Sequence, residues 1–279
     1  MRKIIKEKYY DFAISDFDGT IFNSRKEVSK VTVEAINTFV DNGGTFCVCT
    51  GRMTASIVPF LKHFGIDRGY VISYNGAEIC NISTGEKVYK NHIQTKDLIK
   101  ILNFAKLNNF DVLIYPNDQI TVEKVTKNNA EYMQMSSSSA LVLAESITEY
   151  VESNQLTTGK ALFLTGGDEV IANKIITDLS PILGEEFTLT RSNKYHIDIM
   201  RKSVSKGKTI KKFAKMLNKD LNKLICFGDE MNDESMIAIE DAVGAVPISG
   251  AEQLKLIADL IIDACDDDGV AKAIKKYCI

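Results

Sequence analysis

The sequence has 279 residues, of which 45% are hydrophobic and 25% are charged, a composition typical of a globular protein with one large domain or two ordinary ones. The formal net charge of −3 and the absence of a run of about 18 apolar residues argue against a nucleic-acid or membrane partner. The six scattered cysteines have neither zinc-site nor disulfide-framework spacing, and the charged N-terminal stretch has no signal-peptide core, so we expect reduced thiols in a cytoplasmic protein.

Short apolar runs alternate with amphipathic segments in the first 82 residues. Val33, Ile36 and Phe39 follow one another at helical spacing, and Ser29 is a suitable N-cap. We expect a turn at 74–79, and the other predicted elements are helices at 29–41 and about 54–64 and strands at 11–16, 45–50 and 69–73. Alternation of this kind predicts a parallel sheet with right-handed crossovers.

The middle of the chain has a different pattern, in which helices and strands do not alternate regularly. We expect helices at 95–108 and near 168–179, a polar loop at 136–139, and strands at 111–116, 119–124, 160–166 and 195–200. The last third returns to alternation, with helices expected at 205–218, 231–242, 250–258 and 269–277 and strands at 223–230 and 243–248. We therefore predict an α/β core formed by residues 1–82 and 198–279, with an α+β domain, residues 83–197, inserted between its halves.

Polar residues follow the predicted core strands at the points where these strands end. Asp16 and Asp18 follow the first strand, and Thr50 begins the sequence TGR after the second. Asp229 follows a strand of the last third, and Lys206 precedes a helix. Because ligands of open parallel sheets bind beyond the carboxyl ends of the strands, we expect these side chains to lie at one edge of the sheet.

Three carboxylates at one edge need a compensating positive charge. Asp16, Asp18 and Asp229 would raise one another's pKa, and a divalent cation with oxygen ligands relieves that repulsion. Mg²⁺ suits the site because it uses one or two carboxylates and keeps room for water and a phosphate oxygen. Lys206 and Thr50 would add an ammonium and a hydroxyl, so the residues together predict a site for a phosphoryl group.

The chemistry of this site follows from its two neighbouring carboxylates. One carboxylate can attack phosphorus and form an aspartyl-phosphate, and the other, two residues away, can move protons to the leaving oxygen and from water. Backbone N–H groups near Gly19 and Gly51 can complete an anion cradle.

The sequence resembles the haloacid dehalogenase (HAD) superfamily of phosphohydrolases, and within it the Cof-type branch (subfamily IIB). Four motifs occur in the superfamily's order: DFDGT, TGR, the lysine of SKGK, and GDEMND. NGA at 75–77 and DDDGVAKAIKKY near the C-terminus resemble the Cof-type branch. The resemblance implies a Rossmann-like α/β core, a parallel sheet flanked by helices, with an α+β cap between the second and third motifs. Thr50 and Lys206 are 156 residues apart, which leaves room for such a cap.

The resemblance also implies a role for each motif residue. Asp16 is expected to be the nucleophile and a Mg²⁺ ligand, and Asp18 the general acid/base, with its backbone carbonyl on the metal. Asp229 is expected to bind the metal as well. The phosphoryl group is expected to be held by Thr50, Gly51, Lys206 and Asn232, with Arg52, Asn75 and Asp233 in supporting roles.

These residues predict a magnesium-dependent phosphatase that hydrolyses small-molecule phosphomonoesters, either sugar phosphates or phosphorylated cofactors. The expected partner is therefore a small phosphate ester, with no nucleic acid and no membrane, and the protein is expected to be a monomer or a homodimer. The same core can also serve a phosphomutase or phosphotransferase acting on sugar phosphates. A phospho-accepting signalling module is a further alternative, but Asp18 and the inserted domain argue against it, since an acid/base group shortens the life of an aspartyl-phosphate.

Overall fold

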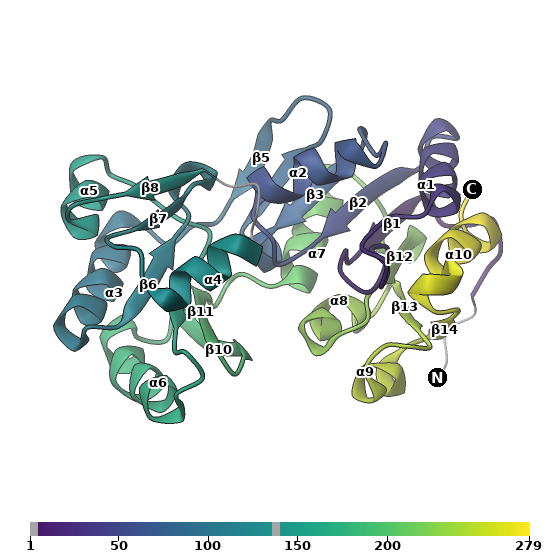
Figure 1. Ribbon diagram of the computed structural model, residues 1–279. Coiled ribbons are helices and arrows are strands. Elements are labelled where there is room, and N and C mark those ends of the chain that lie inside the picture. The colour runs from purple at the N-terminus through teal and green to yellow at the C-terminus, as the bar shows by residue number, and fades with distance from the viewer. Residues whose placement is uncertain (1–4, 136–139) are drawn as a thin grey trace. The chain divides into compact units, whose positions relative to one another are not determined.

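A computed structural model describes residues 5–135 and 140–279, so the loop expected at 136–139 lies outside the described residues. The chain forms two compact units: unit 1 comprises Met1–Tyr89 and Ser205–Ile279, and unit 2 comprises Lys90–Val204 (Figure 1). Unit 2 starts and ends seven residues later in the chain than the expected inserted domain, residues 83–197. Strand β5 (Lys87–Lys90) belongs to the sheet of unit 1, and β11 (His196–Arg201) belongs to the sheet of unit 2.

Unit 1 is built on an eight-stranded sheet with the order β14-β13-β12-β1-β2-β3-β4-β5. The predicted parallel sheet is confirmed from β14 to β3, whereas β4 runs antiparallel to β3 and is joined to it by a turn that contains Tyr74–Gly76. Besides β5, its strands are β1 (Phe12–Ser15), β2 (Thr45–Cys49), β3 (Tyr70–Ser73), β4 (Glu78–Asn81), β12 (Leu224–Phe227), β13 (Val243–Pro247) and β14 (Leu260–Ile262).

Strand β1 lies at the centre of this sheet, between β2 and β12 (Figure 1). From β1 the chain proceeds through β2 and β3 on one side, and after unit 2 it returns to build β12, β13 and β14 on the other. The direction of winding therefore reverses at β1. In open α/β sheets, ligands bind beyond the carboxyl ends of the strands at this switch point, which here is the position of Asp16.

Helices cover both faces of the unit 1 sheet. Phe12 and Ile14 of β1 pack toward one group of helices and Ala13 toward the other, because successive side chains of a strand point to opposite faces. One face carries α1 (Lys30–Asp41), α2 (Thr54–His63) and α10 (Gly269–Tyr277), and the other carries α7 (Lys206–Met216), α8 (Glu234–Ile237) and α9 (Glu252–Ile257). The predicted N-cap is confirmed, since the Ser29 hydroxyl accepts a hydrogen bond from the Thr32 N–H.

The long helix predicted at 231–242 is wrong. Residues Met231–Asp233 form a 3₁₀ turn, and the α-helix that follows, α8, has four residues. The Asp233 carboxylate accepts hydrogen bonds from the backbone N–H groups of Asp229 and Glu230, which folds the segment into a tight loop at its start. The residues expected to begin a regular helix are therefore used to shape the loop after β12.

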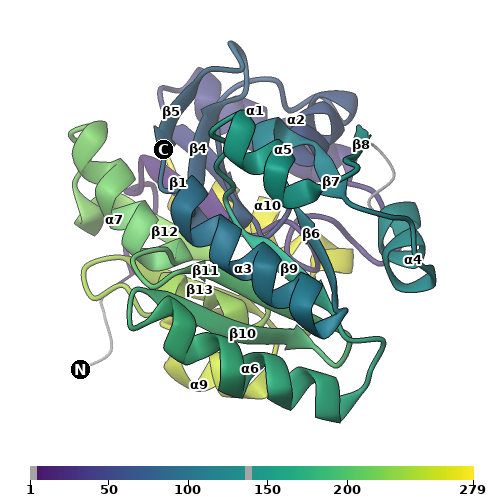
Figure 2. The ribbon, with the colours of Figure 1, turned by 90° about the vertical axis from the view of Figure 1, so that its left-hand side faces the viewer.

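Unit 2 has a six-stranded sheet with the order β10-β11-β9-β6-β7-β8, and the expected α+β pattern is present. Helices α3 (Thr95–Asn108), α5 (Ile147–Ser153) and α6 (Glu169–Leu183) lie over one face of it (Figure 2). Phe163 and Ile197 are fully buried under these helices. The remaining elements are helix α4 (Lys127–Met135) and the strands β6 (Asp111–Ile114), β7 (Ile120–Val122), β8 (Leu141–Leu143), β9 (Ala161–Leu164) and β10 (Phe187–Asn193).

The two ends of unit 2 lie side by side. The Asn91 side-chain amide donates to the Ser203 hydroxyl at 2.9 Å, and each of these residues lies one position inside a boundary of unit 2.

In the described parts of the chain, no helix is both long and apolar enough to cross a membrane. All six cysteines are free thiols, as expected.

The first prediction concerns the N-cap of α6. The Asp168 carboxylate accepts hydrogen bonds from the backbone N–H groups of Val170 and Ile171. Asp168→Ala should destabilise unit 2 by about 1 kcal/mol, because two helix N–H groups lose their partner. Asp168→Asn should retain most of the stability, since asparagine is also a good N-cap. Urea unfolding of both variants checks this, and equal losses for the two would contradict a capping role.

Candidate active site

The expected residues follow three neighbouring strands of the unit 1 sheet. Asp16 follows β1, and its backbone N–H donates to the carbonyl of Phe227, the last residue of β12, at 2.8 Å. Thr50 follows β2 and donates its backbone N–H to Ile72 of β3 at 2.8 Å. Ser15 is in register with both Val48 and Phe227, so β1 and β12 end at the same level of the sheet and β2 ends one residue further along.

Lys206 is the central cation of the site. It is the first residue of α7, whose N-cap Ser205 accepts a hydrogen bond from the Lys208 N–H. The side chain is fully buried, and its ammonium contacts Asp16 Oδ1 at 2.6 Å and Asp233 Oδ1 at 2.5 Å. Residues 190 positions apart in the sequence thus meet in one ion-pair network.

The loop after β12 is held by the second oxygen of Asp233. Its Oδ2 accepts the backbone N–H groups of Asp229 at 3.0 Å and Glu230 at 3.2 Å. Both oxygens of Asp233 therefore have donors, one from Lys206 and one from the loop. This arrangement indicates that Asp233 positions its neighbours.

Asp229 lies against the turn that follows β1. Its Oδ1 accepts the Thr20 hydroxyl at 2.7 Å. Gly19 has a left-handed backbone, with φ of +78°, and a Cβ atom there would lie 2.3 Å from Asp229 Oδ2. Glycine is therefore required at this position for both conformational and steric reasons. The sequence motif contains Thr20, but its contact with Asp229 was not foreseen from the sequence.

The carboxylates are held in an environment that opposes their ionisation. Burial raises the pKa of Asp16 to about 8, an effect that Lys206 opposes and that Asp233 and Asp229 reinforce. Burial also raises the pKa of Asp229 to about 6, although the hydrogen bond from Thr20 opposes this shift. For Lys206, burial would lower the pKa, but Asp16 and Asp233 raise it above its ordinary value. One ammonium faces three carboxylates, so the cluster lacks positive charge.

The donor set suits a hard divalent cation. Carboxylate oxygens of Asp16, Asp229 and Asp233 lie within 4.8 Å of one another. All are oxygen ligands, and the raised pKa values of Asp16 and Asp229 indicate that ionising them without a cation is less favourable than ionising an ordinary aspartate. Because both Asp233 oxygens already accept hydrogen bonds, Asp16 and Asp229 are the two side chains that fit Mg²⁺ best.

Asp18 lies outside this carboxylate cluster. Its side chain is half exposed and pairs with Arg52, which donates from Nη2 to Oδ1 at 2.5 Å and from Nε to Oδ2 at 2.9 Å. The guanidinium of Arg52 in turn contacts the rings of Phe17, Phe22 and Phe60. The sequence singled out Arg52 only as a supporting residue and did not indicate the role of these three rings.

The remaining expected residues lie on the loops around the site. Thr50 is buried, and its hydroxyl accepts the Arg52 N–H at 3.2 Å. Asn75 packs over Gly51, with Oδ1 3.0 Å from the position of a Cβ atom there, and this oxygen is buried without a hydrogen-bond donor among the described residues. Asn232 is exposed on the 3₁₀ turn that precedes α8.

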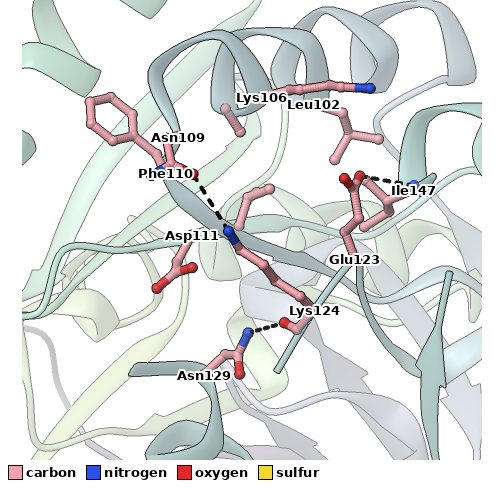
Figure 3. A pocket seen from close by; sticks show the side chains of 11 residues that line it. Leu102, Lys106, Asn109, Phe110, Asp111, Glu123, Lys124, Asn129 and Ile147 are labelled. Atoms are coloured by element: carbon pink, nitrogen blue, oxygen red, sulfur yellow. Dashed lines mark hydrogen bonds between the residues drawn. The ribbon is translucent and has the colours of Figure 1, made fainter. Parts of the chain in front are cut away.

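Two cavities of the structure are candidates for a ligand site. One, of about 500 Å³, adjoins the carboxylates and is lined by Asp18, Gly19, Asp229 and neighbouring residues. The other, of about 110 Å³, lies in unit 2 (Figure 3). In the second cavity Glu123 accepts the Ile147 N–H and Asn129 donates to the Lys124 carbonyl, so these groups are already engaged. Only the first cavity adjoins the cluster.

The second prediction tests the ion pairs of Lys206. Lys206→Met leaves Asp16 and Asp233 buried without their cation and should destabilise the metal-free protein by about 3–5 kcal/mol. Adding Asp233→Asn should recover part of this loss, because one buried charge is removed. Urea unfolding with a chelator measures both. Lys272→Met, which removes an exposed partner of Asp263, is the control and should leave the unfolding midpoint nearly unchanged.

A protein-family model described as haloacid dehalogenase-like hydrolase matches residues 13–274. Phosphatase YwpJ of Bacillus subtilis (strain 168) is 26% identical over 280 residues, covering 93% of this chain and 97% of that protein. HMP-PP phosphatase of Yersinia enterocolitica is 24% identical over 279 residues, covering 96% and 95% of the two chains. A crystal structure of a haloacid dehalogenase-like hydrolase from Bacteroides thetaiotaomicron has a TM-score of 0.83 at 24% identity, covering 95% of this chain and 98% of that one.

These similarities extend over nearly the whole of each chain. The likeness to the Bacteroides structure shows that the fold is shared, and the predicted α/β core with an additional α+β unit is confirmed. The similarity to the HAD superfamily inferred from the four motifs is also confirmed. The chain therefore belongs to the haloacid dehalogenase-like hydrolases and is a phosphatase of that superfamily.

Proposed function

We propose that the protein is a Mg²⁺-dependent phosphatase that hydrolyses small-molecule phosphomonoesters through an aspartyl-phosphate on Asp16. The observation that carries the proposal is the buried cluster in which Lys206 contacts Asp16 and Asp233, with Asp229 close by. The cluster lies at the switch point of a parallel sheet, where α/β proteins bind their ligands. Its deficit of positive charge suits a site that takes up a divalent cation together with a phosphoryl group.

Asp16 and Asp229 would hold Mg²⁺ through their side chains, and Asp18 through its backbone carbonyl. When bound, Mg²⁺ neutralises negative charge on the phosphoryl oxygens. Asp233 serves this arrangement indirectly, because it fixes Lys206 with one oxygen and the loop that carries Asp229 with the other.

In the first step, Asp16 attacks phosphorus and the bond between phosphorus and the leaving oxygen breaks. Lys206 donates to Asp16 Oδ1, so we assign the attack to Oδ2. Lys206 and the Thr50 hydroxyl stabilise charge on the phosphoryl oxygens, with Gly51 and Asn232 completing the phosphate site. Asp18 gives its proton to the leaving oxygen, and the product alcohol departs.

In the second step, water attacks the phosphorus of the aspartyl-phosphate. Asp18 takes a proton from this water, and the bond between phosphorus and the Asp16 oxygen breaks. The products are inorganic phosphate and a free Asp16 carboxylate, while Asp18 is again protonated. Two carboxylates therefore suffice for the cycle, one as nucleophile and one as acid/base.

We also propose that unit 2 is the inserted cap domain of this family and that the substrate is a small metabolite such as a sugar phosphate or a phosphorylated cofactor. The cavity of about 500 Å³ beside Asp18 and Asp229 supports a small ligand. A relative named HMP-PP phosphatase supports a phosphate-containing compound as substrate.

The third prediction concerns the nucleophile. Asp16→Asn should lower the Mg²⁺-dependent hydrolysis of p-nitrophenyl phosphate by at least about 10³-fold, because the attacking oxygen is lost. The variant should remain folded, and without metal it should be at least as stable as the wild type, because one of three neighbouring carboxylates no longer ionises.

The control for this variant is Asp11→Asn. Asp11 directly precedes β1 at its other end and pairs with Lys219 at 3.3 Å, so its loss should leave turnover unchanged. Released phosphate and circular dichroism are measured for both variants. Wild-type activity in Asp16→Asn would overturn the proposed mechanism.

The fourth prediction concerns pH. The pKa values of Asp16 and Asp229, about 8 and about 6, lie above the ordinary value of 3.8. At pH values between the ordinary and the raised pKa of each group, the metal-free folded state therefore binds more protons than the unfolded state. Stability without metal should therefore fall as pH rises from about 4 to about 8. Mg²⁺ requires ionised carboxylates, so the stabilisation that it gives should increase over the same range.

Urea unfolding at several pH values, with a chelator and with millimolar Mg²⁺, measures this dependence. Asp229→Asn should weaken the effect of Mg²⁺ at high pH, whereas Asp241→Asn, a change at an exposed residue away from the cluster, should not. A Mg²⁺ stabilisation that is independent of pH would contradict the assignment.

A further inference from the structure

Arg52 makes the most specific contact of Asp18. Its guanidinium donates from Nη2 to Oδ1 at 2.5 Å and from Nε to Oδ2 at 2.9 Å, so both carboxylate oxygens are held by one planar group. A two-pronged contact of this kind fixes the orientation of a carboxylate as well as its position. The two side chains are 33% and 50% exposed, which distinguishes this pair from the buried pairs of Lys206.

Exposed ion pairs usually hold their members loosely, but three aromatic rings restrain Arg52. The guanidinium carbon lies 5.0 Å from the ring centre of Phe17, 5.6 Å from that of Phe22 and 5.5 Å from that of Phe60. These distances are within the range of cation–π contacts, which are attractive in themselves. Arg52 therefore has a fixed place against this ring cluster, independent of its contact with Asp18.

The ring cluster is itself packed. Phe17 and Phe22 stack at 4.9 Å, and Phe60 of α2 meets Phe22 edge to face at 5.4 Å. Phe17 and Phe22 belong to the turn that also carries Asp18, since the backbone N–H of Phe22 donates to the Phe17 carbonyl at 2.8 Å. The same turn thus supplies both the carboxylate and two of the rings that place the guanidinium.

We propose that Arg52 is the positioning residue for Asp18 in the second step of the reaction, an inference that rests on the proposed function. A guanidinium only donates hydrogen bonds, so its contact suits the carboxylate of Asp18 that accepts a proton from water. The ring cluster fixes Arg52, and Arg52 directs the Asp18 carboxylate toward the water that attacks the aspartyl-phosphate. The proton passes to Asp18 while the bond between phosphorus and Asp16 breaks.

The fifth prediction follows from this assignment. Arg52→Met keeps an unbranched side chain beside the rings but removes the guanidinium. With p-nitrophenyl phosphate, the variant should show a kcat about 10²-fold lower, because the proton acceptor is misplaced. kcat/KM should change less than about threefold, since it reports only the steps up to formation of the aspartyl-phosphate. Rapid mixing should show a burst of close to one nitrophenol per enzyme.

Three further variants separate positioning from other roles. Arg52→Lys keeps the charge without the two-pronged contact and should also have a low kcat with kcat/KM retained. In an Asp18→Asn background, Arg52→Met should lower kcat less than about threefold further, because Arg52 acts through Asp18. Arg68→Met is the matched control, since Arg68 pairs with Asp41 at 2.7 Å in the same unit and should change neither parameter.

The outcomes distinguish this inference from the proposed function. Equal losses of kcat and kcat/KM without a burst, in both Arg52 variants, would mean that Arg52 binds substrate or supports the fold, and would overturn the inference. Unchanged kinetics in both variants would overturn it too. A wild-type protein without Mg²⁺-dependent hydrolysis of any phosphate ester would instead refute the proposed function itself, and with it the step assigned to Arg52.

Discussion

The ammonium of Lys206, held between the carboxylates of Asp16 and Asp233, is the contact on which the rest of the site depends. It joins the first strand of the sheet to the first helix after unit 2, and through Asp233 it reaches the loop after β12. That loop carries Asp229 to the turn at Gly19. A single buried charge thereby connects segments from both halves of unit 1.

The carboxylate cluster lowers the stability of the folded chain when no cation is bound. Three carboxylates lie near one ammonium, and burial raises the pKa values of Asp16 and Asp229, so these groups ionise less readily than ordinary aspartates when no cation is bound. Well-packed apolar residues in place of a buried ion pair are often equally or more stabilising. The polar cluster is therefore better explained by the cation and phosphoryl binding that we propose for it. The contacts of Arg52 with the aromatic rings and with Asp18 fit the positioning role that we propose for that residue.

Much of the core could be predicted because its strands are buried on both faces and appear as continuous apolar runs, such as Phe12–Ser15. The sequence does not indicate β10, because its residues, FTLTRSN, are mostly polar, or β14, because that strand has only three residues. The site's location followed from the rule that ligands bind beyond strand ends. The contacts of Arg52 and Thr20 could not be predicted, because they depend on the three-dimensional path of the turn after β1.

The hydrogen bond between Asn91 and Ser203 has a consequence for how the chain folds. Phe12 and Leu224 pair in adjacent strands although they are 212 positions apart, and closing so long a loop is entropically unfavourable. If unit 2 folds first, its adjacent ends remove residues 90–204 from that loop. Because loop entropy changes by only about 0.6 kcal/mol per doubling of length, domains of very different size can occupy this position in a chain without preventing β1 from meeting β12.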